Sequence, residues 1–312
     1  MLWTLSRASR LLRPSCTKSL PGPVLRTAPL SRNLQTTSTA SPPPHAYLEP
    51  LDLKNHEKPE ELEGAMCLVM NREKARNALS VQMVHEMREG IAKVNASTSA
   101  RLLLLHTPFT GMFCAGADLR ERATMSQTQV SDFLNALRSM MQELEGLSVP
   151  TISVVDGFAM GGGTELALSC DLRVGGPKTT MALPETKLGI IPGAGGTQRL
   201  TRLVGVAKAK ELIYTGRRIE GIEAERIGLV NLLAREPSSA WDAALALSRQ
   251  ILTSAPLALR AAKMAIDSAV DLPLEQGLDM ERKAYATLLD SEDRKEGLRA
   301  FAEKRRAKFQ GK

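Results

Sequence analysis

Residues 156–171, DGFAMGGGTELALSCD, decide how the fold of this 312-residue chain is interpreted. Gly161, Gly162 and Gly163 follow an apolar run at residues 151–155, which is typical of a strand. They open an Ala- and Leu-rich segment, which is typical of a helix. A glycine inside a regular element costs roughly 0.5–1 kcal/mol relative to alanine. Three glycines together therefore indicate that the backbone approaches another group closely at this point.

The start of that helix is a candidate catalytic site. Its first N–H groups have no partner within the helix, and the helix dipole favours a developing negative charge there. Glu165 lies one turn further on among apolar neighbours, so we expect a half-buried carboxylate beside these donors. The alternative is a tight turn followed by a solvated glutamate. A nucleotide site is a weaker interpretation, because neither a G-x-G-x-x-G pattern nor a G-K-[ST] phosphate loop is present.

The composition favours a soluble globular protein and gives no reason to expect a membrane or nucleic acid as partner. No apolar run approaches the roughly 18 residues that a membrane span requires. The formal charge is +7, but residues 1–45 hold six basic residues and no acid. The remainder carries 35 basic against 34 acidic residues, so the folded part is nearly neutral and a general phosphate-binding surface is not indicated.

The first 45 residues resemble a targeting segment. They are rich in Arg, Ser, Thr and Pro, and helical spacing would place Arg7, Arg10 and Arg13 on a different side from Leu5 and Leu12. This composition is typical of a mitochondrial transit peptide, which predicts a protein of the mitochondrial matrix with residues 1–45 removed. The alternative is a basic tail without a targeting role.

Cysteine and histidine spacing gives no sign of disulfides or of a metal site. Cys16, Cys67, Cys114 and Cys170 are scattered, and three remain after the leader, which favours free thiols in a reducing compartment. All four histidines precede the glycine-rich run, and none has the spacing of a zinc site. We therefore predict no metal.

Four domain segments follow from the pattern along the chain. After the leader we expect a linker at residues 46–63, an α/β core at 64–205 and a helical region at 206–312. The core should hold strands near residues 65–70, 101–106, 151–155 and 172–174, helices near 80–95 and 127–147, and a loop at 107–118. Pro184 disfavours a continuing helix, so Glu185 is expected on a loop or at a strand end. Gly193, Gly195 and Gly196 are interpreted as a turn.

Three motifs, in order, resemble the enoyl-CoA hydratase/isomerase (crotonase) superfamily. They are FCAGADL at residues 113–119, the run at 156–171, and PETKLGIIPGAGGTQRL at 184–200, followed by FAEKR at 301–305. The likeness is greatest to the mitochondrial branch that includes methylglutaconyl-CoA hydratase. It covers the chain from about residue 64 to the end. One departure is that Arg306 and Ala307 follow the EKR tail where relatives tend to have proline.

The resemblance implies a fold and a set of site residues. The fold would be an α/β spiral of repeated β-β-α units with a helical C-terminal region that forms a homotrimer or a dimer of trimers. The oxyanion hole would use the backbone N–H groups of Ala117 and Gly162, and the catalytic acids would be Glu165 and Glu185. Binding of the CoA thioester substrate would involve Ala115, Gly116, Ala117, Asp118, Leu119, Gly161 and Gly162. No cofactor is implied, since CoA is part of the substrate.

The resemblance also implies a reaction. Two carboxylates can share the work of adding water across a 2,3 double bond, so both together favour a hydratase of short-chain or branched 2-enoyl-CoA, with 3-methylglutaconyl-CoA as one candidate. Fatty-acid or leucine breakdown would be its setting. Alternatives are an enoyl-CoA isomerase that uses one glutamate, a silent thioester-binding scaffold, and an RNA-binding protein of the same fold. The helix from residue 80 disfavours RNA, because Arg88 and Lys93 stand among acids.

Overall fold

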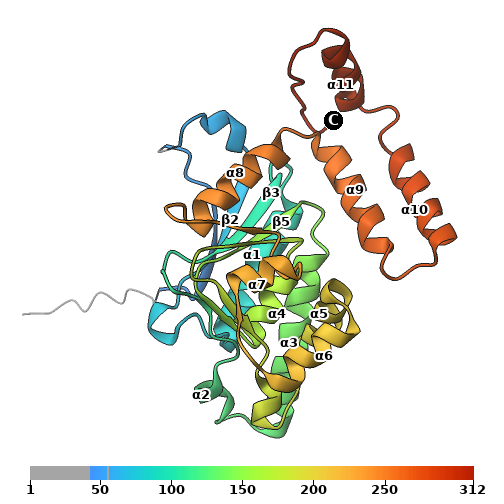
Figure 1. Cartoon of the computed structure of the whole chain (residues 1–312). Helices are drawn as coiled ribbons and strands as arrows, with labels where there is room; N and C mark the ends of the chain where they lie inside the picture. The colour runs from blue at the N-terminus through green and yellow to red at the C-terminus, as the bar shows by residue number, and fades with distance from the viewer. Residues whose placement is uncertain (1–42, 55) are drawn as a thin grey trace, which may run out of the picture. The chain divides into compact units, whose positions relative to one another are not determined.

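The computed structural model describes residues 43–54 and 56–312 (Figure 1). The predicted transit peptide at 1–45 therefore lies outside the described residues except for its last three. No helix in the described ranges is long and apolar enough to cross a bilayer.

A six-stranded sheet forms the centre of the fold. Its strands lie in the order β1 (Ala46–Pro50), β2 (Ala65–Met70), β3 (Leu102–His106), β5 (Thr151–Val155), β7 (Leu172–Gly175) and β10 (Leu232–Leu233). Strand β1 pairs antiparallel with β2, and the remaining pairs are parallel. The four strands predicted in the core are confirmed.

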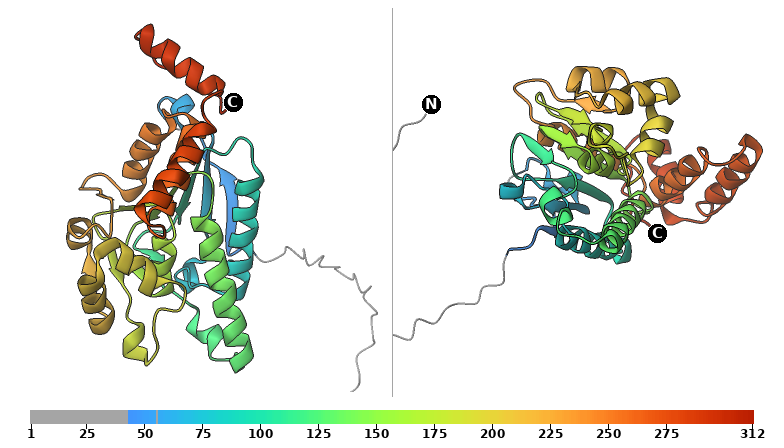
Figure 2. Two further views of the ribbon diagram at one scale, coloured as in Figure 1. Left: turned by 90° about the vertical axis from the view of Figure 1, so that its right-hand side faces the viewer. Right: turned by 90° about the horizontal axis from the view of Figure 1, so that it is seen from below.

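Both faces of this sheet are buried, which explains its continuous apolar strands. Alternate residues enter opposite cores: Leu68 and Leu103 lie in one hydrophobic cluster, and Val69 and Leu104 lie in the other. Helices α1 (Val81–Ala96) and α3 (Gln127–Glu145) lie side by side and contribute to the first cluster (Figure 2). Helix α8 (Ala240–Leu252) contributes to the second.

The two long core helices begin where the sequence predicts. Ser80 caps α1 by accepting a hydrogen bond from the amide of Met83, and Ser126 forms a capping box with Gln129 at the start of α3. Arg88 of α1 donates to both oxygens of Glu143 on α3, so this arginine is engaged within the fold.

A second, four-stranded sheet completes a β-β-α repeat. Its order is β4 (Met112–Cys114), β6 (Phe158–Met160), β8 (Thr180–Ala182) and β9 (Ile219–Glu220), and the first three are parallel. Successive pairs place one strand in each sheet and lead into a helix: β3–β4 into α2 (Leu119–Arg122) and α3, β5–β6 into α4 (Gly162–Leu168), and β7–β8 into α5 (Gly196–Val204). The predicted repeated β-β-α architecture is confirmed.

Two segment predictions for the N-terminal half are wrong. Residues 46–63 are not a linker, since β1 extends the six-stranded sheet and the helical turn η1 (Pro59–Leu62) packs on α8 with Leu62 fully buried. Residues 107–118 are not only a loop, because β4 lies within them. Both strands are short and depend on pairing with a partner strand, which local composition does not reveal.

The region from residue 206 is mainly helical but contributes a strand to each sheet. Helices α6 (Val206–Thr215) and α7 (Gly221–Arg226) flank β9, and β10 joins the first sheet. Helices α9 (Pro256–Ser268), α10 (Leu274–Ala286) and α11 (Glu292–Ala302) follow α8 and extend away from the sheets (Figure 1).

The last helix ends before residue 312, the end of the predicted helical region. It stops at Ala302, and Lys304 adopts the left-handed conformation that turns the chain back. The buried carboxylate of Asp293 then accepts hydrogen bonds from the amides of Gln310 (2.6 Å) and Gly311 (2.9 Å), which fixes the returning tail.

Candidate active site

Two backbone N–H groups meet where β4 and β6 end. Leu79 forms an isolated parallel bridge with Ala117: its amide donates to Gly116, and its carbonyl accepts from Asp118. This pairing leaves the amide of Ala117 unused. Gly162 is the first residue of α4, where a helix leaves its N–H groups unpaired. Among the described residues neither amide donates a hydrogen bond.

Glycine permits these two amides to lie close together. A Cβ on Gly162 would be 3.4 Å from the amide nitrogen of Ala117. Gly116 has a φ of +91°, and a Cβ there would be 2.7 Å from the carbonyl oxygen of Met160. A Cβ on Gly163 would be 2.3 Å from the carbonyl oxygen of Cys114. The close backbone approach predicted from the glycine run is therefore present, and its partner is the loop after β4.

Glu165 is buried and held by a loop from later in the chain. Its side chain is 2% exposed, less than the half-buried position expected from the sequence. Its Oε1 accepts hydrogen bonds from the amides of Ala194 and Gly196, both at 2.8 Å. Burial raises the pKa of Glu165, while these two amides and the positive charge of Arg199 act in the opposite direction. The carboxylate is thus fixed through one oxygen.

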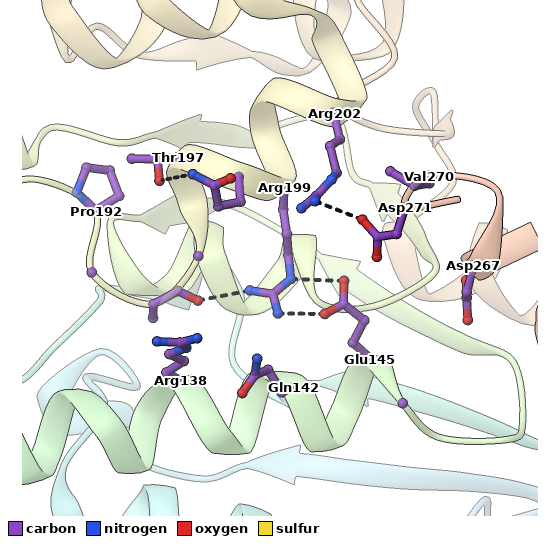
Figure 3. A pocket seen from close by; sticks show the side chains of 15 residues that line it. Arg138, Gln142, Glu145, Pro192, Thr197, Arg199, Arg202, Asp267, Val270 and Asp271 are labelled. Atoms are coloured by element: carbon purple, nitrogen blue, oxygen red, sulfur yellow. Dashed lines mark hydrogen bonds and ion pairs between the residues drawn. The ribbon is translucent and has the colours of Figure 1, made fainter. Parts of the chain in front are cut away.

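Arg199 supports the loop that holds Glu165, and Figure 3 shows the contacts between Arg199 and Glu145. Its guanidinium donates to the carbonyl oxygen of Ala194 at 2.9 Å and to the two carboxylate oxygens of Glu145, the last residue of α3, at 3.1 and 2.7 Å. These contacts lie beside a cavity of about 840 Å³. A continuous chain of hydrogen bonds therefore connects α3, α5 and Glu165.

Glu185 has a different electrostatic environment. It begins the short 3₁₀ turn η3 (Glu185–Leu188), rather than a loop or strand end, directly after Pro184. Burial raises the pKa of Glu185 to about 7, and the negative charge of Glu165 adds to that rise. Its Oε2 is buried and has no hydrogen-bond partner among the described residues. A carboxylate oxygen that is buried without a partner favours the protonated form, so Glu185 is an acid that can hold a proton near neutral pH.

Both glutamates and both amides share one cavity of about 580 Å³. The cavity's lining also includes most of the residues predicted to bind substrate, namely Ala115, Gly116, Leu119 and Gly161. Asp118 is the exception. Its carboxylate caps α2 through the amides of Arg120 and Glu121 and pairs with Arg72 at 2.6 Å, so it stabilises the loop and does not line the cavity.

The groups of the site follow successive strands of the second sheet. Ala117 comes after β4, Gly162 and Glu165 come after β6, and Glu185 comes after β8. Since these strands are parallel neighbours, their carboxyl ends lie along one edge. The topology therefore brings together residues that lie up to 68 positions apart in the sequence.

Several residues of the site escape prediction from the sequence. The amides of Ala194 and Gly196 belong to a glycine-rich stretch interpreted as a turn, and Leu137 has the apolar helical spacing of an ordinary core residue. The lining also includes Leu134, Leu188, Ile190 and Ile191, which the sequence does not single out, and Arg122, a basic residue near the first motif whose direction the sequence leaves open. A second glycine cluster, like the first, is a signal of close backbone approach and was the available clue to Ala194.

Comparisons with known proteins agree with this geometry. A family model described as enoyl-CoA hydratase/isomerase matches residues 60–312. The chain is 47% identical over 253 residues to a human protein named enoyl-CoA hydratase domain-containing protein 2, mitochondrial (80% of this chain, 87% of that protein). It is 41% identical over 255 residues to human mitochondrial methylglutaconyl-CoA hydratase (81% of this chain, 75% of that protein). The crystal structure of enoyl-CoA hydratase from Bacillus anthracis has a TM-score of 0.80 and 38% identity, covering 86% of this chain and all of that one.

Proposed function

The chain belongs to the enoyl-CoA hydratase/isomerase family, and from this premise we propose that it hydrates the 2,3 double bond of short-chain or branched 2-enoyl-CoA thioesters. The observation that carries the proposal is the single cavity lined by Glu165, Glu185 and the amides of Ala117 and Gly162. Two acids in one cavity favour hydration over isomerisation, for which one proton-carrying group is enough.

In the proposed reaction, the two amides bind the thioester carbonyl oxygen. As water adds to C3, electrons of the double bond move toward that oxygen and an enolate develops. Preorganised donors at the developing charge stabilise it, and one such donor contributes roughly 3–4 kcal/mol to lowering a barrier. Because the amides of Ala117 and Gly162 have no acceptor in the described part of the fold, they are available for this role.

The two glutamates then divide the proton transfers. Glu165 orients the water and takes a proton from it as the C3–O bond forms. Glu185, whose pKa is raised to about 7 by burial, delivers a proton to C2 and collapses the enolate. The pair titrates as a coupled unit, so each protonation state depends on the other. The reaction uses no cofactor beyond the CoA of the substrate.

Substrate, location and assembly belong to the same proposal. Relatives named methylglutaconyl-CoA hydratase support 3-methylglutaconyl-CoA as a candidate, and with it a place in leucine or fatty-acid breakdown. Relatives named mitochondrial support a location in the mitochondrial matrix with residues 1–45 as transit peptide. A homotrimer or dimer of trimers is supported by exposed apolar side chains on the last three helices, namely Ile266, Leu274, Tyr285, Leu298 and Phe301.

Loss of the conjugated enoyl-thioester absorbance tests the reaction. Purified protein should consume a 2-enoyl-CoA, and Glu165→Gln should reduce that rate about 10²–10⁴-fold while thioester binding persists. Glu143→Gln, a surface change on α3, is the matched control. Unchanged turnover in Glu165→Gln would refute the assigned role. Activity restricted to 3-enoyl-CoA would instead identify an isomerase.

A further inference from the structure

Arg122, the last residue of α2, is the one lysine or arginine that lines the cavity holding the two glutamates, among the residues that the structure describes. We propose that Arg122 binds a carboxylate at the distal end of the acyl chain, so that the cavity selects 2-enoyl thioesters of dicarboxylic acids. This inference rests on the proposed function, and it identifies both a substrate class and the residue that recognises it.

The charge inside the cavity gives the first argument. Glu165 and Glu185 already place two carboxyl groups in this space. A substrate that brings a further carboxylate would be repelled there, because like charges interact strongly where little water is present. A cation on the cavity wall offsets this repulsion, and Arg122 supplies it.

The availability of Arg122 gives the second argument. Its side chain is half-buried and makes no hydrogen bond or ion pair within residues 43–54 and 56–312. The nearby acids are already engaged: Asp118 pairs with Arg72, and Glu121 accepts a hydrogen bond from the amide of Val81. A free guanidinium matches a carboxylate with two parallel hydrogen bonds, which makes it a selective partner for such a group.

The position of Arg122 gives the third argument. Helix α2 starts directly after the Ala117 amide, and the amide of Arg122 donates to the carbonyl of Asp118 at 2.9 Å. The backbone of Arg122 is therefore held in place by α2, one short helix away from the Ala117 amide that would bind the thioester carbonyl. Other parts of the lining are apolar, with Leu134, Leu137 and Ile190 among them. A single cation in a largely apolar lining discriminates between charged and neutral tails.

The experiment compares glutaconyl-CoA with 2-pentenoyl-CoA, which have equal chain length and differ in the terminal carboxylate. Arg122→Met should lower the ratio of their kcat/KM values about ten- to hundredfold, the effect of losing a charge-assisted hydrogen bond. Arg122→Lys should retain part of the ratio. Arg120→Met, an exposed neighbour outside the cavity lining, should leave the ratio unchanged.

An unchanged ratio in Arg122→Met would overturn the inference. An equal loss for both thioesters, with weaker binding of free CoA, would also overturn it and assign Arg122 to the CoA phosphates. If the wild-type protein hydrates neither thioester, the proposed function fails on its own. Binding of the saturated analogues glutaryl-CoA and pentanoyl-CoA then decides the role of Arg122, since their affinity ratio must fall in Arg122→Met if the inference holds.

Discussion

Glu165 depends on groups that lie far from it in the sequence. The amides that hold its Oε1 are 29 and 31 residues away, and Arg199 fixes the first of them through the carbonyl of Ala194. Two neutral donors and one nearby cation oppose the effect of burial on its pKa. Arg199 is therefore a positioning residue for the proposed base, although it does not line the cavity that contains both glutamates.

Arg199→Met should change the pH dependence of hydration. In the wild-type protein, kcat/KM should fall below the pKa of Glu165, as the base gains a proton, and above about pH 7, as Glu185 loses its proton. Removing the cation raises the pKa of Glu165, so the acid limb should move to higher pH and the active range should narrow. We expect kcat to fall about tenfold from misplacement of the base. Pre-steady-state and steady-state rates across the pH range measure both effects.

Arg202→Met is the control for this experiment. Arg202 lies on α5 like Arg199 and lines the same cavity of about 840 Å³. Within the described part of the chain it pairs only with the exposed Asp271. Arg202→Met should leave the acid limb and the alkaline limb of the pH profile of kcat/KM unchanged. An acid limb that stays fixed in Arg199→Met would show that Arg199 contributes only to stability.

The site residues that the sequence predicts are those with a local chemical signal. Gly162 and Glu165 stand out because three glycines precede an acid in an apolar helix, and Glu185 enters through the family resemblance. Ala194 and Arg199 carry no such signal, because their importance comes from contacts with distant groups. Asp118 was assigned to substrate binding by its motif, whereas its carboxylate is used in a cap and an ion pair.

At the scale of elements, α4 is the structural centre of the site. All seven of its residues are buried, and its first turn packs against the loop after β4. Glycine is required where the two backbones meet, since any larger side chain would displace either the helix or the loop. The geometry of the proposed oxyanion hole therefore depends on side-chain volume as well as on hydrogen bonds.

Gly163→Ala should destabilise the protein. Its Cβ would be placed 2.3 Å from the Cys114 carbonyl oxygen, and overpacking of this kind costs about 1–3 kcal/mol. Chemical denaturation measures the loss as a lower midpoint. Gly277→Ala on α10 is the matched control, because no heavy atom lies within 4 Å of its Cβ position. It should stabilise the helix by about 0.5–1 kcal/mol. Equal effects at the two positions would contradict the packing argument.

The elements that the sequence predicts are those stabilised by their own pattern. Strand β3 and helix α3 are long enough to show continuous or periodic apolar residues. Strands β4, β6 and β8 have three residues each, and they exist because they pair with one another. Strand β1 was mistaken for a linker because its short AYLEP segment ends in proline and follows a Pro-rich stretch.

For the whole molecule, the last three helices present apolar side chains that their own fold does not cover. Leu274 is 80% exposed and Phe301 is 86% exposed. Exposed apolar patches of this kind mark association surfaces, and burying them in a symmetric assembly removes them from water. The proposed trimer gives them a partner of the same chemistry, namely another copy of the chain.

Ile266→Asp combined with Leu274→Asp should shift the assembly toward monomers. Charges introduced on α9 and α10 would be desolvated at an interface, which weakens association strongly. Sedimentation velocity measures the change, and circular dichroism checks that the helices persist. A wild-type chain that sediments as a monomer at micromolar concentration would contradict the proposed assembly.

The carboxyl ends of β4, β6 and β8 carry different groups of the site, and this arrangement separates tasks that many enzymes combine. In the proposed reaction, the amides after β4 and β6 bind the carbonyl oxygen, the glutamate after β8 transfers the proton to C2, and Arg122 on α2 binds the acyl tail. Substitutions at one strand end can therefore change the reaction or the preferred substrate while the groups at the other strand ends stay the same. Replacing Glu185, which follows β8, would change how the enolate reacts, while the amides of Ala117 and Gly162 that stabilise the enolate would remain in place.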